Sequence, residues 1–441
     1  MILDVQATPG AGYAFQQGGS VPGHVKFVPG GVARNIAHSL VLLSNSEKKT
    51  TSSPRELPLL ITAIGDDAAG KSLLESCLHL GMDTKGIISV PQGSTPCVSI
   101  IFDGQGDVAA SVADVALLEK NLTAINLEAY AIDIEKSHSV LIDGDLGQDA
   151  INAICCSIKN NYPSPNKKPL LFFEPVSAPK AVRAVPFLSV LDYASPNLAE
   201  LKAMAEVVLK NYKSSCACHN LKEARGGSEI GKLLQTARPL VQLVLEEGLK
   251  NVLLTLGSLG AALCTLSKDK SSIIVHHAPA LPATIVNCSG AGDCLVAGFL
   301  HELTRANDPV CALAMGVAAA KHAVQCDSNV PANLSASELA VDAVRIVKQN
   351  IKVLIATDRF GADFWINFLL TILAWIPGIF HACWVVATKD DEARAALQHL
   401  QDQTAPYRVA TPYERLPATM PSSSSKAYEE YASAPPPPPP V

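Results

Sequence analysis

The sequence lacks several features that would assign it to a class of protein at once. It has no long run of lysine or arginine, and its formal net charge is −6 with a pI near 6.0. Proteins that bind the phosphate backbone of nucleic acids usually carry a basic patch, so nucleic acid is not an expected partner. Aromatic residues are also scarce, at 5%, while apolar residues reach 48%. This composition favours an α/β core rich in alanine and valine.

Paired CxxC spacing and a recognisable signal peptide are also missing. The twelve cysteines are therefore predicted to be reduced thiols in a cytosolic protein. Cys216, Cys218 and His219 lie close together, but their polar stretch offers no second pair of zinc ligands. We expect no zinc there.

Short apolar runs alternate with helical patterns along most of the chain, and no internal repeat interrupts them. The runs lie at 59–65, 139–145, 169–177, 251–258 and 271–280. Alternating strands and helices predict an α/β fold in which a mostly parallel sheet is covered on both faces and binds ligands at the carboxyl ends of its strands. Residues 94–114 differ, because they alternate around a glycine-rich turn and predict a hairpin that forms a small β lid.

The strongest chemical signal is the segment 287–293, NCSGAGD, between a strand-like run and a helical run. Small residues at a helix start let backbone amides approach a phosphate closely, and the helix dipole adds to the attraction. Asp293 stands at the edge of this turn, where it could accept a proton from a hydroxyl that attacks phosphorus. The alternative is a plain glycine-rich turn with an aspartate placed favourably at a helix N-terminus.

This segment resembles the DTxGAGD signature of the ribokinase-like, or PfkB-type, carbohydrate kinases. Three further segments resemble motifs of that family in the same order: 29–37 (PGGVARNIA), 195–200 (SPNLAE) and 257–261 (GSLGA). The resemblance covers about residues 2–345 and implies a ribokinase-like three-layer sandwich with a small β lid, occupying residues 1–350. Together with 173–177 (FEPVS), the residues of these motifs are most similar to those of the pseudouridine kinases of the family.

The resemblance also implies a role for individual residues. Asp293 would be the catalytic base, with the amides of Gly290, Ala291 and Gly292 stabilising charge. The residues expected to bind the substrate are Asp4, Gly30, Gly31, Asn35 and Thr95. Those expected to bind the nucleotide are Asn197, Gly257, Ser258, Gly260 and Asn329, and Mg²⁺ would be organised by Asn197 and Glu200.

ATP and Mg²⁺ are thus the expected cofactors, and a nucleoside or sugar is the expected small-molecule partner. A requirement for a monovalent cation such as K⁺ and the formation of a homodimer stay open. Taken alone, Asn197 and Glu200 also fit a simple helix cap with a capping-box glutamate.

Other interpretations compete with this one. Residues 65–72 (GDDAAGKS) satisfy the P-loop pattern, and Asp143 could end its Mg²⁺-binding strand. Against this interpretation, Asp66 and Asp67 would place two carboxylates inside a loop that must wrap a polyanion. Within the kinase family, ribose, adenosine or fructose are alternative substrates. A protein of another class, an inactive sugar-kinase fold that serves as a membrane-tethered binding module, is the remaining alternative.

The two ends of the chain depart from the family. Members usually begin with a full strand before an Asp-bearing segment, whereas this chain begins MILDV, so we expect a missing strand and a less stable sheet. Residues 364–387 contain no charged side chain and are long enough to cross a bilayer. Residues 360–388 resemble the second half of Pmp3-type membrane proteins. A kinase anchored there would face the cytosol, and the charged, then Pro/Ser-rich tail 389–441 should be disordered.

Overall fold

The computed structural model describes residues 1–10, 12–13, 18–47, 57–103, 108–161, 168–212, 229–349 and 351–356. The chain divides into two units, Met1–Asp358 and Arg359–Val441, and every described residue belongs to the first. The apolar segment 364–387, the tail and the cysteine pair near residue 217 all lie outside the described residues. Among the helices that are described, none is both long and apolar enough to span a membrane.

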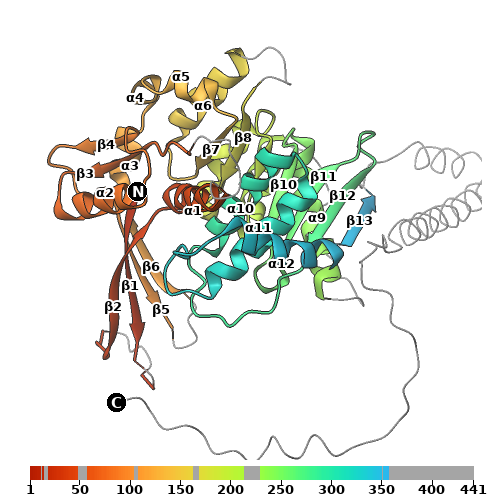
Figure 1. Cartoon of the computed structure of the whole chain (residues 1–441). Helices are drawn as coiled ribbons and strands as arrows, with labels where there is room; N and C mark the ends of the chain where they lie inside the picture. Colours follow the sequence, from red (N-terminus) through yellow and green to blue (C-terminus); the bar gives the residue numbers. More distant parts are fainter. Residues whose placement is uncertain are drawn as a thin grey trace, which may run out of the picture. The chain divides into compact units, whose positions relative to one another are not determined.

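A seven-stranded sheet forms the centre of the molecule (Figure 1). Its strand order is β13-β12-β11-β10-β9-β8-β7, parallel from β7 to β10 and antiparallel from β10 to β13. The strands are β7 (Ser139–Asp143), β8 (Leu170–Glu174), β9 (Tyr193–Ala194), β10 (Asn251–Thr255), β11 (Ala261–Leu266), β12 (Ser272–Ala278) and β13 (Ile351–Ala356). The parallel part reads as continuous apolar runs because both of its faces are covered.

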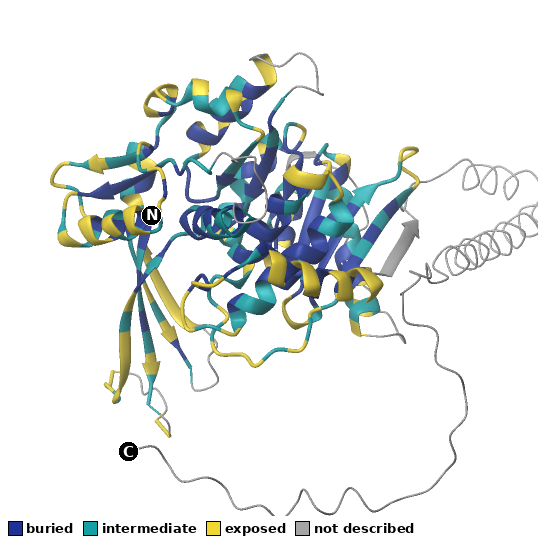
Figure 2. Cartoon of the chain, viewed as in Figure 1, coloured by how far each residue is buried: buried dark blue, intermediate teal, exposed yellow. Residues whose placement is uncertain are grey.

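Helices cover the two faces of this sheet, and the ribbon of their buried residues is dark blue in Figure 2. The buried side chains between helices and sheet form two layers. The first layer is packed by α6 (Gln148–Asn161), α8 (Leu198–Tyr212) and α9 (Glu229–Glu246). The second is packed by α1 (Val32–Glu47), α10 (Ala291–Ala306), α11 (Pro309–Val324) and α12 (Ala336–Gln349). The predicted three-layer α/β sandwich is confirmed.

Shorter helices connect the remaining elements. They are α2 (Ala68–His79), α3 (Ala116–Asn121), α4 (Ala124–Glu128), α5 (Ala131–Lys136), α7 (Ala178–Ala181), and the 3₁₀ turns η1 (Val182–Phe187) and η2 (Gly257–Leu259).

An aromatic cluster fixes α10 on the sheet. The rings of Phe172 on β8 and Tyr193 on β9 stack with centroids 5.9 Å apart, and Phe299 of α10 meets Tyr193 edge-on at 5.4 Å. Such aromatic pairs prefer offset-stacked and edge-to-face arrangements. The cluster therefore helps to fix the position of α10 along the strands, with its N-terminus at the carboxyl edge of the sheet.

The lid is a second, four-stranded sheet with the order β2-β1-β5-β6. Its strands are β1 (Ile2–Pro9), β2 (Gly23–Gly30), β5 (Cys97–Phe102) and β6 (Val108–Asp114). The hairpin predicted for 94–114 is present as β5 and β6, which pair antiparallel. Strand β1 lies in the middle of the lid and brings Asp4 into it, a pairing with the hairpin that was not predicted from the sequence.

A third, two-stranded sheet of β3 (Thr62–Gly65) and β4 (Ile87–Val90) stands apart from the other two. Within the described residues, no strand joins β3 to β7. The space between them is a cavity lined by residues of both strands, including Thr62 and Leu141, together with Met1. The buried ammonium group of Met1 donates to the hydroxyl of Thr62 there. The lower sheet stability expected from the N-terminus stays a prediction.

Candidate active site

Polar groups follow each of the four parallel strands at one edge of the central sheet. Asp143 ends β7, Glu174 ends β8, Asn197 follows β9, and the loop 257–260 follows β10. In sheets of this kind ligands bind at the carboxyl ends of the strands. The observed edge is therefore the expected place for chemistry.

The N-terminus of α10 opens onto the same region. Gly290 precedes the helix with φ +78°, and a Cβ there would meet the carbonyl oxygen of Asn329 at 2.0 Å, so only glycine fits. A Cβ on Gly292 would meet no atom within 4 Å. The backbone beside Gly292 is therefore uncrowded, and the role expected for the amides of Gly290, Ala291 and Gly292 stays a prediction.

Asp293, in the first turn of α10, is held by a residue from the other end of the chain. Asn35 on α1 donates from Nδ2 to Oδ2 of Asp293 over 2.8 Å. The neighbouring Arg34, which is buried, donates from Nη1 to Oδ1 of Asn35 over 3.1 Å and thereby fixes the orientation of the amide. Asn35 was expected to bind sugar hydroxyls, but its amide nitrogen is directed at Asp293.

Burial raises the pKa of the Asp293 carboxyl to about 7. The hydrogen bond from Asn35 and the charge of Arg34 oppose this rise, whereas the carboxylates of Asp4 and Asp143 add to it. A carboxyl with a pKa near neutrality is well matched to accept a proton from a hydroxyl, because an effective base titrates close to the working pH.

Asp4 and Asn329 join the lid to this centre. Asn329 donates from Nδ2 to Oδ2 of Asp4 over 2.8 Å, and burial raises the pKa of Asp4 to about 6. A Cβ on Gly30 would lie 2.2 Å from Oδ2 of Asp4, so the first glycine of the pair is required by this close approach. Gly31 needs to be glycine for another reason, its φ of +93°. Asn329, expected to bind the nucleotide, thus contacts Asp4, which was expected to bind the substrate.

Asn197 and Glu200 form a reciprocal helix cap at the start of α8. The amide of Asn197 donates to Oε2 of Glu200 over 2.8 Å, and the amide of Glu200 donates to Oδ1 of Asn197 over 3.0 Å. This is the capping box that the sequence left open as an alternative. It does not exclude a role in binding Mg²⁺, which stays a prediction.

Glu174 is a member of the site that the motif comparison missed, although it lies within the FEPVS segment. Burial raises its pKa well above the usual range, and the carboxylates of Asp293 and Glu200 raise it further. Such a concentration of carboxylates suits a hard cation that prefers oxygen ligands, which is the chemistry of Mg²⁺. The residues present therefore fit Mg²⁺, although no group of three or more close metal ligands is found in the described part of the chain.

The loop 257–260 lies beside this carboxylate group, because the amide of Thr255 on β10 donates to the carbonyl of Pro196 over 3.0 Å. Gly257 has φ +57° and Gly260 φ +91°, and a Cβ on Gly260 would meet Ala278 O at 2.1 Å. The tight turn that results leaves Ser258 exposed. The expected contact of this loop with the nucleotide stays a prediction.

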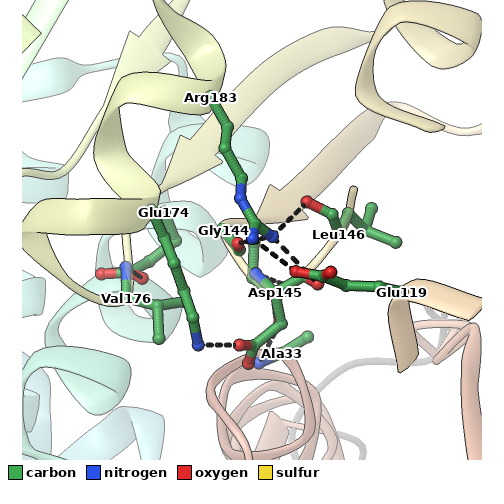
Figure 3. A network of polar contacts seen from close by, with 10 residues as sticks. Ala33, Glu119, Gly144, Asp145, Leu146, Glu174, Val176 and Arg183 are labelled. Carbon is green, nitrogen blue, oxygen red and sulfur yellow. Dashed lines mark hydrogen bonds and ion pairs between the residues drawn. The ribbon is translucent and has the colours of Figure 1, made fainter. Parts of the chain in front are cut away.

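A network of polar contacts fixes the carboxyl end of β7 (Figure 3). Arg183 points into the turn 144–146 and donates to the carbonyl oxygens of Gly144 and Leu146 at 3.0 and 2.9 Å. Asp145 is ion-paired with Lys180. Asp143 accepts from the amide of Ala33 at 3.3 Å, at the start of α1. The network therefore holds the helix that carries Asn35.

Thr95 lies outside the hydrogen-bonded group around Asp293. Its hydroxyl accepts from the amide of Gly65 over 3.0 Å, and its own amide donates to Asp67 over 2.8 Å. Its assignment to the substrate stays a prediction.

The same contacts occupy the 65–72 turn, which has the P-loop pattern. Asp67 caps α2 by accepting from Gly70 N at 2.8 Å, and Lys71 is exposed. The turn closes on the carboxylate of Asp67, whose negative charge would repel a phosphate there.

The pfkB family carbohydrate kinase model matches residues 5–336, which is most of the chain. The chain belongs to this family. A pfkB kinase phosphorylates with ATP, so the protein is an ATP-dependent kinase of the carbohydrate or nucleoside type, and the P-loop interpretation is wrong.

Two curated relatives are pseudouridine kinases. The chain is 30% identical to that of Arabidopsis thaliana, over 78% of this chain and 93% of the relative. It is 25% identical to that of Escherichia coli K12, over 66% and 78%. Among solved structures, the ribokinase of Arabidopsis thaliana complexed with ribose and ATP shares the fold, with a TM-score of 0.55 at 17% identity, covering 78% of this chain and 96% of the ribokinase.

A second family model, the Pmp3 proteolipid membrane potential modulator, matches residues 351–387. A 26-residue stretch is 65% identical to plasma membrane proteolipid 3 of Gibberella zeae, covering 46% of that protein. The first residues of this match, 351–356, form strand β13 of the kinase sheet. The two matched regions are therefore joined at a structural element of the kinase.

Replacing Asp293 by Asn should lower kcat by about 10²–10⁴-fold or more, because the base is lost, while ATP still binds. The matched control is Lys71→Ala, which alters the exposed lysine of the P-loop-like turn and should change kcat by less than about threefold. Steady-state kinetics and equilibrium binding of ATP measure both effects. Loss of turnover in Lys71→Ala together with normal turnover in Asp293→Asn would contradict the assignment.

The pKa of Asp293 predicts the pH dependence. Because the base must be ionised, kcat/KM should fall about tenfold per pH unit below pH 7 and level off above it. Removing the negative charge of Asp4 by Asp4→Asn should lower the pKa of Asp293 and move the acid limb to lower pH. A limb that stays in place in Asp4→Asn would show that another group controls the profile.

Proposed function

We propose that this kinase transfers the γ-phosphoryl group of ATP to the 5′-hydroxyl of pseudouridine. The observation that carries the proposal is the contact of Asn35 with Asp293 at the open N-terminus of α10. It places a carboxyl with a raised pKa beside a set of backbone amides, which is the pair of functions that phosphoryl transfer needs. The choice of pseudouridine is supported by the similarity to two pseudouridine kinases.

The residues of the chain divide the reaction between them. Asp4, Gly30 and Gly31 would hold the ribose hydroxyls, leaving the 5′-hydroxyl at Asp293. Asp293 accepts its proton as the 5′-oxygen forms a bond to the γ-phosphorus and the bond from that phosphorus to the β-phosphate oxygen breaks. The amides of Gly290, Ala291 and Gly292 stabilise the charge that develops on the transferred group. The products are pseudouridine 5′-phosphate and ADP.

Residues Asn197, Glu200 and Glu174 would hold Mg²⁺ and its waters near the phosphates. When bound, Mg²⁺ supplies positive charge that neutralises the phosphate oxygens. Without a cation, burial keeps the Glu174 carboxyl protonated to a higher pH, as its raised pKa indicates, and a bound Mg²⁺ would favour the ionised form. A requirement for K⁺ stays a prediction.

The alternatives kept open by the sequence differ in their support. An inactive binding module would have no need for a base held by Asn35 and oriented by Arg34, so the geometry favours an active enzyme. Ribose, adenosine and fructose remain competing substrates, because the base and the anion turn would serve any of them equally.

The substrate is tested with purified protein, ATP and a panel of acceptors. We expect kcat/KM for pseudouridine to exceed that for uridine, adenosine, ribose and fructose, measured by coupled ADP release and by the mass of the product. Equal or better values for adenosine, ribose or fructose would remove the assignment to pseudouridine and keep the kinase.

We also propose that residues 360–388 attach the kinase unit 1–350 to a membrane, leaving the tail 389–441 disordered. The Pmp3 match and the absence of charged residues from 364–387 support this. A homodimer stays a prediction, supported by the outer face of the lid, where Phe27 and Val112 are 68% and 73% exposed.

Removal of the residues after 358 should give a protein that stays in the high-speed supernatant and phosphorylates normally, while the full chain sediments with membranes until detergent is added. The cut keeps β13, which pairs with β12. A matched truncation after residue 349 lacks β13 and should unfold at lower temperature. A full chain that is monodisperse without detergent would exclude the anchor.

A further inference from the structure

Gln6 is a buried polar residue of the lid that the mechanism above does not use. It lies on β1, two residues after Asp4, so both side chains leave the same face of the strand. Its side chain is 1% exposed. Nε2 of Gln6 donates to Oδ1 of Asn329 over 3.2 Å, which ties it to the group around Asp4.

The hydrogen bonds around Asn329 determine which way the amide of Gln6 faces. Nδ2 of Asn329 donates to the carboxylate of Asp4 and, at 3.4 Å, to the carbonyl of Pro29. Both partners only accept, so the nitrogen of Asn329 must face them and its oxygen must face Gln6. An oxygen can bond only the nitrogen of the Gln6 amide. Oε1 of Gln6 is therefore directed away from Asn329.

This Oε1 atom has no hydrogen-bond partner among the described residues. A buried carbonyl oxygen without a donor is costly, and native structures rarely keep one without a reason. Lys26 faces Gln6 across the β1–β2 pair, but its Nζ is engaged by Asp327. The lid therefore contains a buried acceptor that a donor on a bound molecule would satisfy.

The position of Gln6 indicates which part of a nucleoside it meets. Asp4 lies against Gly30, beside the turn that leads to α1 and Asn35. Gln6 is one strand repeat farther from this turn, about 7 Å along β1. With the 5′-hydroxyl at Asp293 and the ribose hydroxyls at the charged and stronger acceptor Asp4, the next group outward is the base.

We propose that Oε1 of Gln6 accepts a hydrogen bond from the N1–H group of pseudouridine and selects this nucleoside against uridine. The inference rests on the proposed function. In pseudouridine the ribose is bonded to carbon, so the ring keeps both N1–H and N3–H. In uridine the ribose occupies N1, and only N3–H remains. A site built around a substrate N–H strongly rejects an analogue that lacks it, because the buried acceptor is then left unpaired.

The test combines Gln6→Met, which keeps the length of the side chain and removes the acceptor, with pseudouridine, N1-methylpseudouridine, uridine and 3′-deoxypseudouridine. We expect the wild type to favour pseudouridine over N1-methylpseudouridine and uridine by about ten- to hundred-fold or more in kcat/KM. Gln6→Met should lose most of this preference through a lower value for pseudouridine, while KM for ATP is unchanged. Lys26→Met, which disturbs the same sheet and keeps the acceptor, should retain the preference.

Each outcome decides between the proposals. If Gln6→Met lowers kcat/KM equally for all four nucleosides, Gln6 stabilises the lid and the inference is wrong. If Gln6→Met loses only the preference for pseudouridine over 3′-deoxypseudouridine, a ribose hydroxyl is the donor to Gln6. The assignment of Gln6 to the base is then wrong. A wild type that uses pseudouridine and N1-methylpseudouridine equally overturns the role of Gln6 alone. A wild type that phosphorylates ribose and no nucleoside overturns the proposed function as well.

Discussion

The hydrogen bond from Asn35 to Asp293 is the contact on which the active site depends. It joins two residues 258 positions apart and ties the start of α1 to the start of α10. Each helix is fixed independently, α1 through Asp143 and α10 through the aromatic cluster at Phe299. The carboxyl is consequently held where burial raises its pKa, and the same amide that positions it limits that rise. The contact thus positions the base and moderates the rise in pKa that burial causes.

The motifs in the sequence were sufficient to predict the sandwich, the lid hairpin and the family. Periodic apolar runs locate strands, and a turn such as GAGD is a local feature whose glycines are required by the backbone itself, as the φ of Gly290 shows. The partners of these residues were harder to predict. Asn35 was assigned to sugar hydroxyls, because nothing in the local sequence indicates that its amide meets Asp293 and Arg34.

Other parts of the site were missed because their role comes from burial and long-range contacts. Glu174 ends an ordinary buried strand, and burial together with the approach of Asp293 and Glu200 raises the pKa of its carboxyl. Gln6 resembles any polar residue of a half-exposed strand until Asn329 orients its amide. The P-loop pattern at 65–72 is the opposite case, in which a matching motif does not indicate function. Its residues have the correct spacing, but Asp67 serves as the N-cap of α2.

The buried first residue has a practical consequence for work on this protein. Met1 is only 4% exposed, and its ammonium group lies between β3 and β7 against Thr62. Any affinity tag or fluorescent protein fused before Met1 would have to leave through this narrow space and would separate the ammonium from its partner. A fusion after β13 would start from the edge of the central sheet opposite to β7. The position of a tag is therefore a variable in every activity measured on this enzyme.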